Sequence, residues 1–252
     1  MKFQTILLER EGLVGRLTLN RPDKRNAVNA TMIGEIAEAF ACGLAGAEAL
    51  VLAGAGTSFS AGLDLAEHAG RSAEQTMAIS ARWHRVIETI GRGPPAVIVA
   101  LTGHVIGGGL EIAAAAHIRI AEADCHFALP EGRHGIFVGG GASVHVGRLI
   151  GTSRLMEMML TGRTIDADEA LRIGLVHYVV PPGTALQHAL DVATTVAGNA
   201  PLSNMMILQA LPRIAAMAPT EGLFTESLAV ALTQSSDEAR ERMMQFLEKR
   251  SA

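Results

Sequence analysis

The 252-residue sequence contains few aromatic residues and few cysteines. One Trp, one Tyr and seven Phe leave little aromatic surface on which nucleobases could stack. Two cysteines, Cys42 and Cys125, are too few for a framework of several disulfides or for a cysteine-rich metal cluster. The formal net charge of −4 argues against general attraction to nucleic acid or to an anionic membrane. The composition therefore favours neither kind of partner.

Several sequence motifs are also absent. The chain has no apolar run long enough to cross a bilayer, and residues 1–4 lead into a mixed strand rather than into the apolar core of a signal peptide. No Gly-x-Ser-x-Gly nucleophile elbow, phosphate-binding P-loop or complete Gly-x-Gly-x-x-Gly fingerprint occurs. The histidines show no metal-ligand spacing: His134 and His145, for example, are eleven residues apart and have no cysteine partner at ligand intervals. We expect a cytoplasmic protein in a reducing compartment, without a bound metal.

Aliphatic residues, in contrast, are abundant. The sequence is 49% hydrophobic, mostly Ala, Leu, Val, Ile and Met, which is enough to bury a sizeable core. Its length fits one large domain, or a core with a smaller appendage. Strand patterns alternate with helical patterns as far as Pro181-Pro182-Gly183, and only helical patterns follow. We expect an α/β core over residues 1–183 and a helical packing or oligomerisation region over residues 184–252.

The expected elements are defined by hydrophobic periodicity and by glycine and proline punctuation. Strands are expected at residues 12–19, 49–53, 96–101, 117–121, 125–128 and 174–180. Helices are expected at residues 30–44, 73–90, 112–116, 141–150, 153–160, 167–173, 184–198, 201–217, 221–234 and 237–249.

Three consecutive glycines, Gly107 to Gly109, separate a buried strand pattern from a helix pattern that includes Glu111. Glycine lets the backbone approach a ligand closely, and the first turn of a helix offers unpaired N–H groups to negative charge. A second turn, at residues 58–64, also follows an apolar strand pattern. Two backbone donors from two such turns, converging on one point, would form an oxyanion hole, which is a catalytic device.

Five segments together resemble the crotonase superfamily, whose best-known members are the enoyl-CoA hydratases. The resemblance runs over nearly the whole chain, with the segments in the family's order and at its separations. Residues 20–29 resemble the first CoA-binding loop, 59–64 and 107–111 the two oxyanion-hole segments, 130–131 the segment with the second acidic residue, and 246–250 the end of the C-terminal helix.

The resemblance implies an α/β crotonase-like spiral of ββα units with a C-terminal helical trimerisation region, as a homotrimer or a dimer of trimers. The N–H groups of Leu63 and Gly108 would hold the thioester oxygen of an acyl-CoA substrate. CoA would arrive as part of that substrate, so no metal or separate cofactor is expected. The residues that the resemblance assigns to binding of the CoA ester are Lys24, Arg25, Ala27, Ala61, Gly62, Asp64, Leu65, Gly107, Phe246 and Lys249.

Glu111 and Glu131 match both acidic residues of the family's hydratases. By that resemblance Glu111 deprotonates the water that attacks C3 of the substrate, and Glu131 exchanges the proton at C2. Paired carboxylates suit such a reaction because one accepts a proton while the other donates one. The resemblance therefore implies reversible addition of water to a trans-2-enoyl-CoA, giving a 3-hydroxyacyl-CoA.

Other interpretations stay open. A Δ3-Δ2-enoyl-CoA isomerase would need proton shuttling but no activated water. A non-catalytic homologue would only bind an acyl-CoA or associate with RNA, although two retained carboxylates and the negative net charge argue against it. Taken alone, Glu111 would favour a helix start through the helix dipole, and Glu131 would be an ordinary surface carboxylate. Trp83 and His84, on a helix that flanks the acyl pocket in this family, are expected to be packed in the core or exposed.

The loop after Glu131 departs from the family pattern. Val138 stands where family hydratases usually have a proline, and residues 142–145 replace much of the segment that follows. Arg133 and His134 occur where an aliphatic residue is common. We expect a guanidinium or imidazole beside Glu131 to lower its pKa, which would make it a poorer proton donor. The acyl group and the reaction subtype are therefore left open by the sequence.

Overall fold

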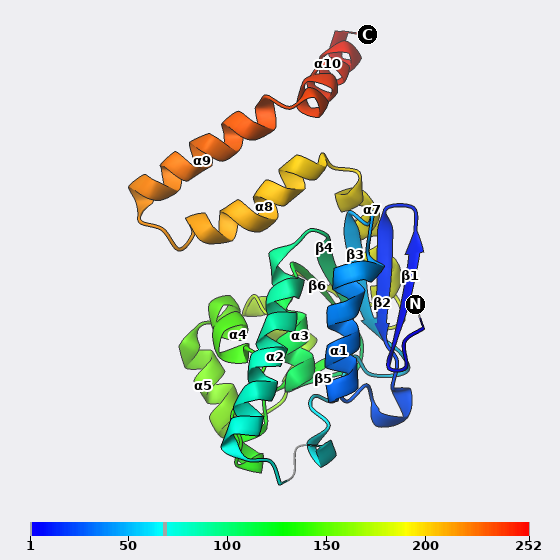
Figure 1. Ribbon diagram of the computed structural model, residues 1–252, viewed down its shortest axis with the longest axis vertical. Helices are drawn as coiled ribbons and strands as arrows, with labels where there is room; N and C mark the ends of the chain where they lie inside the picture. Colours follow the sequence, from blue (N-terminus) through cyan, green and yellow to red (C-terminus); the bar gives the residue numbers. More distant parts are fainter. Residues whose placement is uncertain (1, 68–69, 252) are drawn as a thin grey trace.

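Figure 1 shows the computed structural model of the chain, which describes residues 2–67 and 70–251, with the backbone alone for residues 249–251. The strands form two mixed sheets. The larger sheet is parallel except for its antiparallel edge strand, and its spatial order is β1 (Ile6–Glu11), β2 (Val14–Leu19), β3 (Ala49–Gly54), β4 (Ala96–Leu101), β6 (Ile118–Glu122) and β9 (Tyr178–Val180). The smaller sheet contains β5 (His104–Ile106), β7 (His126–Ala128) and β8 (Ile165–Asp166).

Helices follow most of the strands, which confirms the predicted α/β class. In chain order they are α1 (Ala30–Glu38), α2 (Ala73–Arg92), α3 (Gly108–Ala115), α4 (Ala142–Ile150), α5 (Thr152–Thr161), α6 (Ala167–Arg172), α7 (Ala185–Ala197), α8 (Pro201–Ile214), α9 (Pro219–Gln234) and α10 (Asp237–Ser251). A π-helical turn, Ala39–Gly43, continues α1, and short 3₁₀ turns lie at Pro22–Lys24, Leu65–Glu67 and Glu131–His134.

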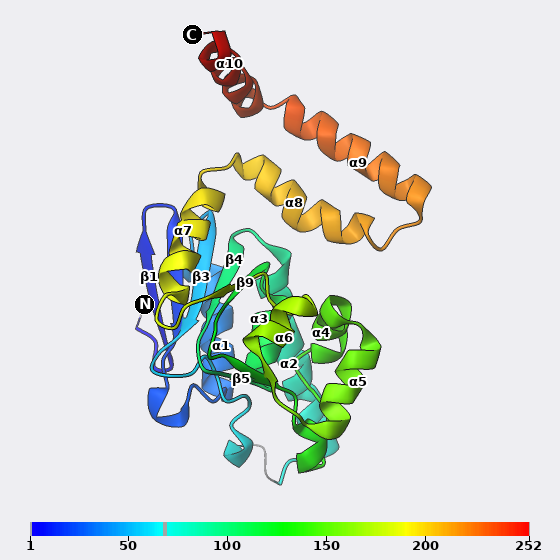
Figure 2. The same ribbon diagram turned by 180° about the vertical axis from the view of Figure 1, so that it is seen from behind.

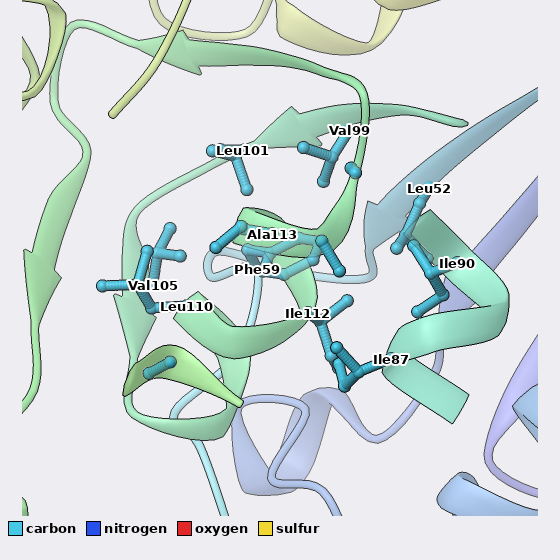
Figure 3. Close-up of a cluster of buried hydrophobic side chains, with 14 of the residues drawn as sticks. Leu52, Phe59, Ile87, Ile90, Val99, Leu101, Val105, Leu110, Ile112 and Ala113 are labelled. Atoms are coloured by element: carbon cyan, nitrogen blue, oxygen red, sulfur yellow. The ribbon is translucent and has the colours of Figure 1, made fainter. Parts of the chain in front are cut away.

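The central strands β3 and β4 are apolar along nearly their whole length because helices cover both faces of the sheet. On one face, α7 presents four buried alanines at intervals of four residues, so its backbone lies close to the sheet. On the other face, side chains of α1, α2 and α3 pack against the strands in the larger core cluster. Figure 3 shows part of this cluster, including Leu52 and Val99 from the strands with Ile87 and Ile112 from the helices.

Two short strands were not predicted, and one predicted strand is shorter than expected. β5 and β8 contain three and two residues, too few to show an alternating pattern. In the expected strand at residues 174–180, only Tyr178–Val180 pair with β6. Gly174 has a φ of +81° and ends the turn after α6, so the first part of this segment is a connection.

The last three helices extend away from both sheets, whereas α7 packs against the larger one (Figures 1 and 2). α8 and α9 form a helical hairpin, and α10 follows at its end. Their large apolar side chains are mostly exposed, among them Leu223, Phe224 and Leu228. The oligomerisation role and the boundary at residue 183 stay predictions. Within the described residues, no helix has the length and apolar character needed to span a membrane.

Candidate active site

The turn after β3 lies against the smaller sheet. The N–H of Ser60 donates to the carbonyl of His104 at 3.1 Å, and the N–H of Ile106 donates to the carbonyl of Ser60 at 3.0 Å. Gly62 has a φ of +90°, and a Cβ at this position would lie 2.8 Å from the Ile106 carbonyl oxygen. Only glycine fits this conformation and this spacing, so the turn is held close to the start of α3.

Leu63 in this turn and Gly108 at the first position of α3 are brought together. A Cβ built on Gly108 would lie 3.5 Å from the backbone nitrogen of Leu63. Neither of these two N–H groups donates a hydrogen bond to another residue that the structure describes. Two backbone donors from two separate turns therefore lie close together without an acceptor among the described residues, as the two donors of an oxyanion hole must. Their catalytic role stays a prediction.

Glu111, one turn into α3, is fully buried and held by three donors. Its Oε1 accepts hydrogen bonds from the N–H groups of Gly140 at 2.8 Å and Ala142 at 3.1 Å. Its Oε2 accepts one from the indole N–H of Trp83 at 3.1 Å. Burial is the largest influence on the Glu111 carboxyl and raises its pKa above the ordinary value, although the three donors and the nearby charge of His84 oppose the rise.

Gly140 leaves room for the hydrogen bond between Trp83 and Glu111. A Cβ on Gly140 would overlap both the indole Nε1 of Trp83 and the Oε2 of Glu111. Trp83 was expected in core packing or on the surface; it is buried in the core, but its polar atom also binds the candidate catalytic carboxylate. Sequence reasoning did not find this pair, although the lone Trp and the Gly139–Gly141 run were visible in the sequence.

Glu131 begins the 3₁₀ turn after β7 and is also buried. Its Oε2 has no hydrogen-bond partner among the described residues. Burial, together with the nearby negative charge of Glu111, raises the pKa of Glu131 to about 7. This carboxyl therefore titrates near neutral pH, where it can act as an acid or a base.

The expectation that Arg133 or His134 lowers the pKa of Glu131 is wrong. The guanidinium of Arg133 points to α5 instead, where its Nε and Nη2 donate to the Thr161 carbonyl at 3.1 and 2.7 Å. His134 is exposed at the end of the same short turn. Desolvation is therefore the largest influence on the Glu131 carboxyl.

An apolar cavity of about 200 Å³ adjoins these groups. Trp83 and Leu63 line it, and the aliphatic and aromatic side chains of Ile136 and Phe137 contribute a wall from the loop after Glu131. This loop is the segment that departs from the family pattern in sequence. Because Leu63 lines it, the cavity has room for an apolar group beside one of the two backbone donors. Its full lining is Ile33, Leu63, Leu65, Thr76, Ile79, Ser80, Trp83, Ile136, Phe137 and Gly139.

The first predicted CoA-binding loop lies beside the turn that contains Leu63. The Val28 N–H donates to the Gly62 carbonyl at 2.7 Å, and the Ala61 N–H donates to the Arg25 carbonyl at 2.8 Å. The side chains of Lys24 and Arg25 are exposed, so their positive charges can reach a phosphate group in solvent. The structure thus places the predicted loop residues together.

Asp64 and Phe246, two other predicted binding residues, lie in different surroundings, and their part in CoA binding stays a prediction. Asp64 forms an ion pair of 3.0 Å with Arg21, and the Arg21 guanidinium also donates to the Ala27 carbonyl. The ion pair therefore holds two loops together. Phe246 lies on α10, which points away from the sheets and the site (Figure 1). The side chain of Lys249 lies outside the described residues. No cluster of three or more potential metal ligands occurs in the part of the chain that the structure describes.

Comparison with known proteins covers the whole chain. The enoyl-CoA hydratase/isomerase family matches residues 9–252. The short-chain-enoyl-CoA hydratase of Clostridium acetobutylicum is 33% identical over 258 residues, covering 99% of this chain and 97% of that protein. A crystal structure from Rhodopseudomonas palustris CGA009 has a TM-score of 0.95 and 46% identity, covering 98% of this chain and 96% of that one. An enoyl-CoA hydratase structure from Bacillus anthracis has a TM-score of 0.92 and 30% identity, with 98% and 97% coverage.

The family match spans the sheets, both turns with backbone donors and both buried carboxylates. Identity above 30% over nearly the full length of both chains excludes a chance likeness confined to one glycine motif. This protein therefore belongs to the enoyl-CoA hydratase/isomerase, or crotonase, family.

Proposed function

We propose that this protein is an enoyl-CoA hydratase, a lyase that reversibly adds water to a trans-2-enoyl-CoA. The observation that carries the proposal is the contrast between two buried carboxylates. Glu111 is held by three hydrogen-bond donors, whereas the Oε2 of Glu131 has no partner among the described residues. One group is set up as an oriented base and the other as an acid that titrates near neutral pH.

Glu111 would accept the proton of the attacking water. A carboxylate has about four lone-pair sites, and three of those on Glu111 are used by Trp83, Gly140 and Ala142. The remaining site is free to bind one water molecule. The three donors favour the ionised form, which is the form that accepts a proton, and so oppose the effect of burial, which raises the pKa of this carboxyl.

Glu131 would supply the proton to C2. As the oxygen of water bonds to C3, the electron pair of the C2–C3 double bond moves toward the thioester and an enolate develops. The carboxyl proton of Glu131 then bonds to C2, while Glu111 holds the proton taken from water. Exchange with solvent returns both groups to their starting states, so atoms and charge balance over the cycle.

The N–H groups of Leu63 and Gly108 would stabilise the enolate oxygen. Such preorganised donors act most strongly where negative charge develops during the reaction, and each can contribute about 3–4 kcal/mol. The apolar cavity beside Trp83 would take the acyl group, and the exposed cations of the loop at Lys24 and Arg25 would meet the CoA phosphates. CoA is carried by the substrate, so the proposed reaction needs no metal or redox cofactor.

We further propose that the protein assembles as a homotrimer or a dimer of trimers, and that it is cytoplasmic. The support for assembly is the apolar surface of the last three helices, which water would otherwise surround. On α9 this surface includes Leu223 at 64% and Phe224 at 66% exposure.

Loss of the ultraviolet absorbance of crotonyl-CoA, which reports the conjugated double bond, tests the reaction. We expect purified wild type to remove the absorbance, and E111Q and E131Q to be slower by about 10²–10⁴-fold each. E38Q, which changes an exposed carboxylate on α1, is the matched control and keeps the wild-type rate.

Three other outcomes would contradict the proposal. Turnover of a 3-enoyl-CoA but not of crotonyl-CoA, with dependence chiefly on one carboxylate, would indicate an isomerase. Binding of CoA esters without turnover of either substrate would indicate a non-catalytic homologue. Hydration that survives both carboxylate substitutions would remove Glu111 and Glu131 from the mechanism.

A further inference from the structure

We propose that Trp83 is a positioning residue: its indole N–H fixes Glu111 so that Oε2, and not Oε1, meets the reacting water. The inference rests on the proposed function, because it takes Glu111 as the base. It adds a residue that the sequence interpretation placed in the core or on the surface, and it assigns the reactive oxygen.

The hydrogen bonds of Glu111 distinguish its two oxygens. Oε1 accepts from two backbone N–H groups, those of Gly140 and Ala142, which uses both of its lone-pair sites. Oε2 accepts only from Trp83, at 3.1 Å. A water molecule that approaches Glu111 therefore finds its free acceptor site on Oε2.

The indole is suited to hold this oxygen because Nε1–H is a donor only. It cannot rotate to become an acceptor, as a hydroxyl could, so it always presents a hydrogen to Oε2. Trp83 is 2% exposed, and its ring is confined by neighbours on several sides. The orientation of its N–H is thus set by packing, and the packing in turn orients the carboxylate.

Gly140 shows that this contact is built into the surrounding loop. Any side chain at Gly140 would overlap both Trp83 Nε1 and Glu111 Oε2, as its Cβ would occupy the space between them. The same glycine donates its N–H to Oε1. Gly140 therefore leaves room for the hydrogen bond between the Trp83 indole and Oε2, and it also donates one of the two hydrogen bonds that Oε1 accepts.

Trp83 also contacts the other parts of the site. Its Cζ2 lies 3.6 Å from the position that a Cβ on Gly108 would take, next to the candidate oxyanion donor. The ring lines the apolar cavity together with Leu63. One side chain thus relates the base, the backbone donor and the acyl cavity to each other.

A purely structural role makes a different prediction. If Trp83 only fills space, phenylalanine should preserve much of the packing, and loss of the N–H should not alter the ionisation of Glu111. If Trp83 positions Glu111, W83F leaves Oε2 without its donor, and the ionised form of a buried carboxylate becomes less favourable.

The first experiment measures crotonyl-CoA hydration by W83F as a function of pH. We expect kcat to fall by about ten- to a hundredfold, KM to change little, and the acid limb of the profile to move to higher pH. I90V removes a methyl group from a buried residue on the same helix, away from Glu111, and should keep the wild-type profile. If the pH profile of W83F has the same shape as that of wild type and differs only in the height of its rates, the inference is overturned.

The second experiment needs no turnover, because Trp83 is the only tryptophan in the chain. Its fluorescence in wild type should change with pH as Glu111 ionises, and E111Q should lack that transition. Other titratable groups face this region, namely Glu131 from its turn, His84 on α2, and His145 on α4 near His84. The charge of Glu111 also raises the pKa of Glu131, so E131Q is measured as well, and a transition that is absent from E111Q but present in E131Q reports Glu111.

The two experiments separate the inference from the function on which it rests. If E111Q still hydrates crotonyl-CoA, the proposed function fails, whatever the fluorescence shows. If E111Q is inactive but its fluorescence titrates like that of wild type, the positioning role of Trp83 fails alone. Should W83F not fold, the comparison of wild type with E111Q still decides the question.

Discussion

Gly107 lies directly against the carboxylate of Glu131: a methyl group on its Cα would stand 2.8 Å from Oε1. Gly107 has a φ of +50° and immediately precedes Gly108, the first residue of α3. The glycine therefore allows the carboxyl to approach the backbone donor at the helix start. Burial at this position, beside the charge of Glu111, is what raises the pKa of Glu131 to about 7.

The first prediction concerns the direction of the pH dependence. Hydration needs protonated Glu131, so its rate should fall as pH rises through about 7, the pKa of that carboxyl. Addition of water takes up no net proton, so the equilibrium constant is independent of pH, and kcat/KM for dehydration of 3-hydroxybutyryl-CoA should fall in parallel with that for hydration. Initial rates of wild type and E131Q across neutral pH check this. A fall near pH 7 that persists in E131Q would remove Glu131 from proton transfer at C2.

The second prediction concerns stability. A carboxyl whose pKa is raised in the folded state binds its proton more tightly there than when unfolded, so stability falls as pH rises from about 4.5 to about 7. E131Q removes the ionisable group and should be more stable than wild type at pH 8, by at most about 3 kcal/mol. At pH 4 both proteins carry a neutral side chain and should unfold alike. Urea unfolding at the two pH values measures this, and an equal difference at both would contradict it.

The third prediction isolates one backbone donor. G108P removes the N–H at the first position of α3, where a helix tolerates proline because that N–H has no intrahelical partner. We expect kcat to fall by about 10²–10³-fold without loss of helical circular dichroism. G108A keeps the N–H, and its Cβ would make only ordinary contacts of 3.5 Å with Leu63, so it should stay active. Equal activity of the two variants would exclude Gly108 from the oxyanion hole.

The fourth prediction concerns the loop that supports the site. Asn26 is fully buried; its amide donates to the carbonyls of Ala55 and Ser58 at 2.8 and 2.9 Å, and its Oδ1 accepts from the Arg21 N–H. N26A leaves these groups unpaired and should lower the free energy of unfolding by about 2–4 kcal/mol. N29A, which removes the N-cap of α1, should cost only about 1 kcal/mol. Chemical denaturation compares them, and a smaller loss for N26A would contradict this reading.

The fifth prediction concerns the last three helices. F224E places a charge on the exposed apolar surface of α9 and should lower the mass of the assembly measured by light scattering. M77E changes an exposed apolar residue on α2, at 72% exposure, and should leave the mass unchanged. A wild-type protein that is monomeric at micromolar concentration would contradict the proposed trimer.

Local sequence signals were sufficient for most of the fold. The continuous apolar runs of β3 and β4 predicted buried strands, and the Asn29 cap and the residue spacing of α1 predicted a helix. Such signals depend on the nearest residues along the chain, so they can be read without knowing the tertiary contacts. β5 and β8, with three and two residues, show no pattern of their own, and only pairing with β7 defines them.

For the candidate site, too, some features could be predicted from the sequence and others depend on tertiary contacts. By itself, the sequence determined the α/β class, the two glycine turns and, through resemblance to a family, the two carboxylates Glu111 and Glu131. Only the tertiary structure decided what surrounds them: Trp83 binds Glu111 across 28 residues of sequence, and Arg133 points to Thr161 rather than to Glu131. Hydrogen bonding and desolvation of a side chain depend on groups distant in the chain, and these contacts set its pKa and its chemistry.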